Sequence, residues 1–390
     1  MEGKHVVGWK DLPVEIQDMI LHHVVRATKV GKNWHGSKKW KVMEIVLPFV
    51  CREWKERKPF WRNISLETKD SVSWTSLAAS MGSISLMKWL RENGCPFDPT
   101  TSIKAAKKGN IELLKWLKEN GCPFKARTCA SAASGGHLEA LKWLREHGCH
   151  WDRFTCASAA KKGHREVLEW AKENGCDWNE GTCAGAAGGG HLDLLKWLRE
   201  KKCPWDHFTF TNAAEGGHIE VLRWALDNYP SHTVSYACEL AADNNHRDVL
   251  LLLRERGIVS PGSCASAARQ GNLDLLKWQR ENGLPWDEGT CHAAALHGHL
   301  EVLKWARENG CSWDEETSSC AASSGDLGVL KWVRENGCSW HEHTCFNAIC
   351  SGNLEVLKWA VEHGCPWNDD SCEAAAEKGF LEILKWATEN

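Results

Sequence analysis

The chain has 390 residues, of which 43% are hydrophobic and 25% charged, as in ordinary soluble proteins, but it holds 24 Trp against 2 Tyr. Residues 1–70 carry 14 of the 48 Lys and Arg and 9 of the 51 Asp and Glu, which leaves the remainder with 34 cations and 42 carboxylates. This acidic remainder excludes nucleic acid as its main ligand, because phosphate binding depends on clustered Lys and Arg. No apolar run approaches the ~20 residues that span a bilayer, and the start lacks the apolar core of a secretory signal. We therefore expect a cytoplasmic or nuclear protein with no membrane contact and with reduced cysteines.

The first 70 residues predict a small helical module. Apolar residues at Ile16, Ile20 and Val24 describe one face of an amphipathic helix. This segment resembles an F-box, which begins with a Leu-Pro-x-Glu-Ile helix and continues with a Val-Cys-Arg-x-Trp segment that ends in an aromatic residue. The matching residues are Leu12, Pro13, Glu15, Ile16, Ile20 and Leu21, followed by Val50, Cys51, Arg52, Trp54, Phe60 and Trp61. The insert GKNWHGSKKWK between them departs from the usual F-box spacing.

The F-box resemblance implies docking onto the Skp-type adaptor of a cullin-RING ubiquitin ligase. The adaptor-binding residues would be Leu12, Pro13, Ile16, Ile20, Leu21 and Trp54. The competing interpretation is that residues 1–70 only cap the first repeat of the array that follows, because a terminal repeat must hide its outer apolar face. Both roles are compatible with the sequence.

Residues 71–390 repeat with a period of 27. Successive Trp residues mark it, at positions 89, 116, 143, 170, 197, 224, 278, 305, 332, 359 and 386. The gap between Trp224 and Trp278 is two periods, and its missing member is Leu252, displaced by one residue. Twelve units result, and one inserted and one deleted residue predict a local distortion within residues 229–262.

Each unit predicts two helices separated by glycine, as residues 137–163 illustrate. Leu138, Ala140, Leu141, Trp143 and Leu144 cover an arc too wide for a one-sided helix, which is typical of a helix packed between two neighbouring copies. Gly148 suits the left-handed position that ends a helix. The second helix is expected to begin at Thr155 as its capping residue, with the paired Ala159 and Ala160 allowing a close backbone approach.

These units resemble the ankyrin repeat in their paired alanines, their Gly-His turn, their aliphatic helix and their Asn-Gly ending, as in AALHGHLEVLKWARENGCSWD at residues 294–314. Ankyrin units have 33 residues and a Thr-Pro-Leu-His opening, whereas these are shorter and open with Thr-Cys. The missing residues are those that would extend the β-hairpin finger. We expect an all-α fold, an α-solenoid of about twelve helix-turn-helix ankyrin-like repeats preceded by the F-box-like module.

The repeated Trp, Cys and His columns favour packing over chemistry. We expect the helix Trp column to lie in the seam between repeats and the loop column (Trp151, Trp178, Trp205, Trp286, Trp313, Trp340 and Trp367) to join adjacent loops. No Cys-x-x-Cys pair occurs, and the densest candidate metal cluster is Cys338, His341, His343, Cys345 and Cys350. The His of each Gly-His turn is expected to hydrogen-bond loops. With no phosphate loop or nucleophile motif outside the repeat, we predict no enzyme activity, no metal and no cofactor.

A protein partner is the remaining expectation, with a plain interaction scaffold as the alternative to a ubiquitin-ligase substrate receptor and a metal-binding array as a third possibility. Binding residues are sought where the units differ from one another. The predicted partner-binding residues are Phe154, Phe208, Glu288, Glu315 and His343 in the short loops, and Lys107, Lys161, Glu215, Arg269 and Glu377 near the Gly turns.

Overall fold

The structure, a computed structural model, describes residues 74–92, 94–229 and 234–366, together with residues 380, 382 and 386. These residues form α-helices and connecting turns, with no strand among them. The chain divides into two compact units, Met1–Trp178 and Asn179–Asn390.

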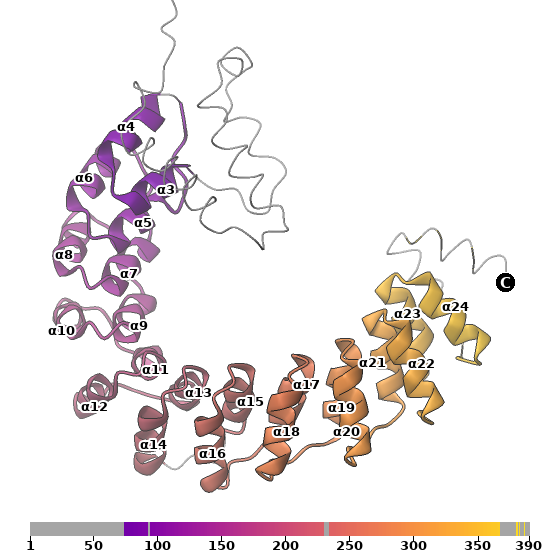
Figure 1. Cartoon of the computed structure of the whole chain (residues 1–390). Helices are drawn as coiled ribbons and strands as arrows, with labels where there is room; N and C mark the ends of the chain where they lie inside the picture. The colour runs from indigo at the N-terminus through magenta and orange to yellow at the C-terminus, as the bar shows by residue number, and fades with distance from the viewer. Residues whose placement is uncertain are drawn as a thin grey trace, which may run out of the picture. The chain divides into compact units, whose positions relative to one another are not determined.

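The first unit contains four helix pairs among its described residues (Figure 1). Their bounds are α3 Trp74–Met81, α4 Ile84–Glu92, α5 Thr101–Lys107, α6 Ile111–Glu119, α7 Ala126–Ser134, α8 Leu138–Glu146, α9 Arg153–Lys161 and α10 Arg165–Glu173.

The second unit contains seven more pairs of the same kind among its described residues. Their bounds are α11 Glu180–Gly188, α12 Leu192–Glu200, α13 His207–Glu215, α14 Ile219–Asn228, α15 Tyr236–Asp243, α16 Arg247–Glu255, α17 Gly262–Arg269, α18 Leu273–Glu281, α19 Glu288–Leu296, α20 Leu300–Glu308, α21 Glu316–Ser324, α22 Leu327–Glu335, α23 Thr344–Ser351 and α24 Leu354–Glu362. The expected helix-turn-helix repeat without a β-hairpin finger is therefore confirmed over the described residues.

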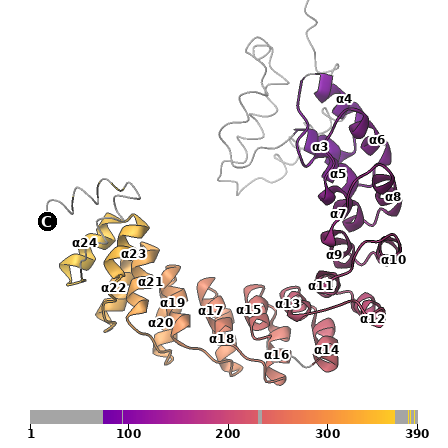
Figure 2. The same ribbon diagram turned by 180° about the vertical axis from the view of Figure 1, so that it is seen from behind.

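Within each unit the odd-numbered helices pack side by side in one layer and the even-numbered helices form a second layer (Figures 1 and 2). We call the first of these the odd-helix layer of its unit. Its helices are rich in small residues, and paired alanines such as Ala159 and Ala160 are fully buried. The even helices bury Leu, Val and Ala against the odd ones, as Leu141 and Leu144 do. Close packing of the small-residue helices is what the alanine pairs make possible.

Glycines allow the turn between the two helices of a pair. Gly109, Gly136 and Gly163 take positive φ angles of 67°, 74° and 76°, a region that a side chain disfavours. The His that follows such a glycine reaches back to the preceding repeat: Nε2 of His137 lies 3.1 Å from the Lys107 carbonyl oxygen, and Nε2 of His164 lies 3.2 Å from that of Ser134. The loop-bonding role expected for this column is confirmed.

The loop aromatic column joins neighbouring repeats, as expected. Trp151 packs edge-on against Trp170 of the next repeat, with ring centroids 5.8 Å apart. On its own side, the guanidinium of Arg145 stacks 4.1 Å from the Trp151 ring and donates a hydrogen bond of 3.0 Å to the Cys149 carbonyl. One arginine thus ends its helix and holds the aromatic ring that contacts the next repeat.

Two expectations need correction. The helix Trp column lies in the seam between repeats, but its described members other than Trp197 are only half-buried, because the loop aromatics cover one side of each ring. The helix predicted to begin at Thr155 begins at Arg153 instead. Its cap is Asp152, whose carboxylate accepts a 3.0 Å hydrogen bond from the Phe154 amide, while Thr155 is buried one turn in and bonds back to the Asp152 amide.

The irregular segment is visible on both sides of residues 230–233, which lie outside the described residues. Helix α14 is one residue longer than its neighbours, and α15 and α17 are one residue shorter than most odd helices. Asn245 holds the turn position with φ of 58° where other repeats place glycine. The inserted and deleted residues are therefore absorbed at the helix ends.

Candidate partner-binding surface

The odd-helix layer presents a regular set of exposed positions in each unit. In α9 the exposed residues are Arg153, Phe154 and Lys161, whereas Thr155, Cys156 and the alanine pair are buried. The exposed positions are therefore the first two residues and the last residue of the helix. Because the same columns recur 27 residues apart, they place variable side chains side by side on successive helices.

Phe154 and Phe208 lie in one column of this surface, at the second position of α9 and α13 respectively. Their side chains are 56% and 54% exposed, which is unusual for phenylalanine. Each amide is held by the carboxylate of the capping Asp two residues earlier, Asp152 or Asp206, at 3.0 Å. The caps therefore position two aromatic side chains in solvent, one in each unit, as exposed anchors require.

Lys107 and Lys161 end α5 and α9 in the first unit, where both side chains are exposed. Neither forms an ion pair with another described residue. Their backbones are structural, since the Lys107 carbonyl accepts the His137 bond, but their ammonium groups are directed to solvent. They are available to a partner.

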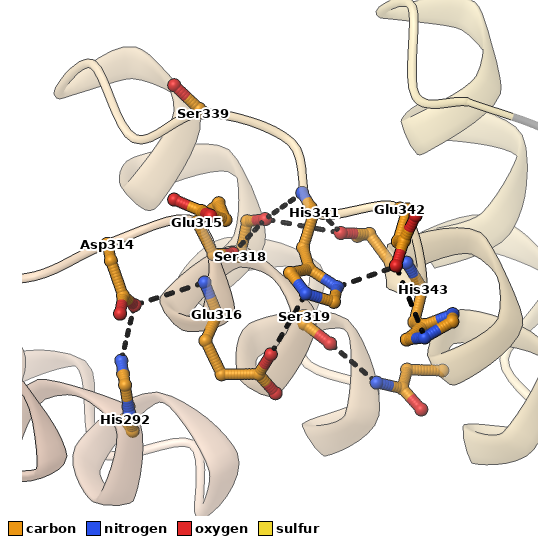
Figure 3. A network of polar contacts seen from close by, with 12 residues as sticks. His292, Asp314, Glu315, Glu316, Ser318, Ser319, Ser339, His341, Glu342 and His343 are labelled. Atoms are coloured by element: carbon orange, nitrogen blue, oxygen red, sulfur yellow. Dashed lines mark hydrogen bonds and ion pairs between the residues drawn. The ribbon is translucent and has the colours of Figure 1, made fainter.

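Glu288, Glu315 and His343 lie at the start of α19, α21 and α23, in the second unit, and are exposed. Around them a polar network crosses three repeats (Figure 3). His292 Nε2 lies 2.6 Å from Asp314 Oδ1, and His341 Nε2 lies 3.4 Å from Glu316 Oε2.

The same network also orders the backbone before α23. The His341 amide donates to Ser318 Oγ at 3.2 Å, and the His343 amide donates to His341 Nδ1 at 3.1 Å. Ser318 Oγ in turn lies 3.2 Å from Thr344 Oγ1. The loops of this edge are thus held in place by cross-repeat bonds, which keeps Glu288, Glu315 and His343 exposed on a rigid support.

Arg269 differs from the other predicted basic residues. Its guanidinium lies 2.6 Å from the Asp243 carboxylate of the preceding odd helix, and Gln270 donates to the same carboxylate at 3.0 Å. Its charge is therefore neutralised within the molecule. Glu215, at the end of α13, is exposed, whereas Glu377 lies outside the described residues.

Sequence reasoning missed several members of this surface. Tyr236 is 57% exposed in the Phe154 column, but the inserted residue shifts it out of the 27-residue register. Met81, 43% exposed at the end of α3, precedes the first fully spaced turn. Arg127 and Arg153 are exposed at the start of α7 and α9, and their columns could have identified them.

The adaptor-binding residues predicted from the F-box resemblance, Leu12, Pro13, Ile16, Ile20, Leu21 and Trp54, all lie outside the described residues.

The cysteine columns meet in the interior rather than at this surface. Cys156 and Cys176 have their sulfur atoms 3.1 Å apart, and both are buried. Burial raises the pKa of Cys264 and of Cys238 to about 12, so these thiols stay protonated and are poor nucleophiles and poor metal ligands.

The predicted dense cluster around Cys338 is dispersed. Cys338 is buried and donates to the Asp314 carbonyl at 3.1 Å, while His343 is exposed at the neighbouring loop. Among the described residues no group of three or more His, Cys, Asp or Glu side chains is arranged to hold a metal ion. Within the same residues, no helix has both the length and the apolar character to cross a bilayer.

Comparison with known proteins supports the repeat type. Residues 264–307, from α17 to α20, match a family model described as ankyrin repeats (many copies). Among solved structures, the ankyrin repeat domain of human ASB11 is similar, at 16% identity and a TM-score of 0.35, over 48% of this chain and 99% of that one. No curated protein matches the chain.

Proposed function

Because this chain is an ankyrin-repeat protein, a non-catalytic protein-binding scaffold, we propose that it is the substrate-recognition subunit of a cullin-RING ubiquitin ligase of the F-box type. In this proposal residues 1–70 bind a Skp-type adaptor, which connects the chain to a cullin, and residues 71–390 bind an unidentified protein substrate.

The observation that supports binding by the array is its layer of exposed, variable side chains on buried small-residue helices. The helix pair is nearly constant, with alanines such as Ala132, Ala133, Ala159 and Ala160 fully buried. The exposed positions beside them change from one repeat to the next, as Arg127, Phe154 and Phe208 show. A constant scaffold with variable exposed residues is the arrangement by which repeat proteins recognise other proteins.

The ligase role is supported by the sequence of residues 12–61, through the Leu12-Pro13 helix start and the segment that ends at Trp61. The test is affinity purification of the full-length chain from cells. We expect a Skp-type adaptor and a cullin to be enriched, and the Leu12→Ala/Pro13→Ala double variant to lose both. A matched control, Lys38→Ala/Lys39→Ala in the insert, should retain them.

The alternative is a plain ankyrin scaffold whose N-terminal residues only cap the first repeat. It predicts no adaptor enrichment above a control bait and a lower melting temperature for the Leu12→Ala/Pro13→Ala variant. Loss of the adaptor without a change in melting temperature supports the ligase role; the reverse pattern refutes it.

A further inference from the structure

Charge is segregated between the two odd-helix layers. In the first unit, the three loop-and-helix segments 98–109, 125–136 and 152–163 hold eight cations and two carboxylates. The cations are Lys104, Lys107, Lys108, Lys125, Arg127, Arg153, Lys161 and Lys162. The equivalent segments of the second unit, from residue 179 to residue 352, hold eleven carboxylates and one cation, Arg269.

All eight cations of the first unit are exposed, and none forms an ion pair with a described carboxylate. The ion pairs of that unit instead join residues of the same even helix, as Lys115 to Glu112 does. The two carboxylates of the layer are already engaged: Asp98 accepts the Thr100 amide at 2.7 Å and Asp152 accepts the Phe154 amide at 3.0 Å. The layer therefore carries a strong positive field that nothing within the described residues neutralises.

The cations are spaced on a rigid support. Helices α5, α7 and α9 pack side by side through their alanines, and packed helices lie about 8–10 Å apart. An extended peptide advances about 3.3 Å per residue, so about three of its residues pass each repeat. A carboxylate at every second or third position would meet a new cation on each helix.

Apolar anchors accompany the charge. Met81 and Phe154 are the large hydrophobic residues exposed in the described part of the first unit, and both lie on its odd-helix layer. The Arg153 guanidinium lies 5.1 Å from the centre of the Phe154 ring, so a cation and an aromatic face are presented together.

We propose that the odd-helix layer of the first unit binds an acidic protein segment that carries apolar side chains among its Asp and Glu residues. The proposal rests on the proposed function in that the array binds protein. A nucleic acid is disfavoured, because a long polyanion would also meet the eleven carboxylates that the same molecule carries on its second layer.

The test is fluorescence anisotropy with the full chain and a labelled peptide of about twelve residues in which one Leu follows every two Glu. We expect saturable binding that weakens as salt rises. The variant Lys107→Glu/Arg127→Glu/Lys161→Glu should weaken binding at least about tenfold, which corresponds to about 1.4 kcal/mol.

The matched control reverses three cations of the even helices, Lys88→Glu/Lys115→Glu/Lys142→Glu, which changes the net charge equally. It should bind the peptide within about twofold of the unaltered chain. Equal weakening by both variants would show a general charge effect and overturn the proposal.

Absence of peptide binding, equal binding of a peptide with Lys in place of Glu, or tighter binding of single-stranded or duplex DNA of similar length would also overturn it. The adaptor experiment involves residues 12 and 13, so the two proposals fail separately.

Discussion

A single histidine column shows how the repeat uses a titratable side chain structurally. The ring of His218 lies between α11 and α13, where a Cβ on Gly190 would come within 2.6 Å of it. Burial lowers the pKa of His218, with smaller contributions in the same direction from His191 and His246, while its hydrogen bond to the Gly188 backbone acts the other way. The neutral ring is therefore the form that the folded array favours.

This preference makes stability depend on pH. A histidine whose pKa is lowered by folding binds its proton more readily in the unfolded chain, so the free energy of unfolding falls as the pH falls below the ordinary value of about 6.5. Asn occupies the same column at Asn353, where its amide donates to the Gly325 carbonyl at 2.8 Å. We expect His218→Asn to retain stability at pH 7.5 and to lose less than the unaltered chain at pH 5.5, measured by urea denaturation. Parallel losses in both proteins would contradict this reading of the column.

The glycine turns separate two costs at the scale of the helix pair. Gly121 follows α6 with φ of 76°, and a Cβ there would meet nothing within 4 Å. Gly109 follows α5 with φ of 67°, and a Cβ there would lie 2.5 Å from the His137 ring. The first glycine is required by backbone conformation alone, the second also by the close approach of the next repeat.

Alanine at each position should reveal the difference. Gly121→Ala is expected to reduce the free energy of unfolding by about 1 kcal/mol, the cost of a side chain in the left-handed region. Gly109→Ala should reduce it by about 2–3 kcal/mol, because the displaced His137 ring also loses its bond to Lys107. Thermal unfolding followed by circular dichroism measures both, and equal effects would show that the His137 contact contributes nothing.

Element order was predictable because every repeat carries the same turn signals. The Gly-His turn, the buried alanine pair and the absence of a hairpin finger all followed from a period of 27 residues. The helix start at Arg153 did not, because the Asp152 carboxylate and the Thr155 hydroxyl can both cap, and only the backbone direction decides between them. Tyr236 was missed because an inserted residue displaces it from its column.

The surface was less predictable than the fold. Column position identified Phe154 and Phe208 as variable residues, and both are exposed. The same reasoning could not show that Arg269 is neutralised by Asp243 on the neighbouring helix, since that depends on side-chain direction across 26 residues of sequence. The segregation of charge becomes visible only when residues are assigned to a layer rather than counted along the chain.

For the whole molecule, opposite layers of charge on one chain favour association between copies. The net charge is only −3 and the isoelectric point is about 6.7, so overall repulsion between copies is weak near neutral pH. We expect sedimentation velocity to show oligomers at about 0.01 M salt, where screening extends to ~30 Å, and monomers at about 0.3 M. The Lys107→Glu/Arg127→Glu/Lys161→Glu variant should remain monomeric at both. Oligomers that persist at high salt would point to an apolar contact instead.

The bonds that His137 and His164 form each reach back one repeat, to carbonyls 30 residues earlier. A chain held together in this way has no distant contact to lock it when its ends are pulled apart. Under tension its repeats would release singly, each yielding about 9 nm of extended backbone from its 27 residues. The array would then lengthen in steps and recoil, which makes it an elastic link between whatever is bound at its two ends.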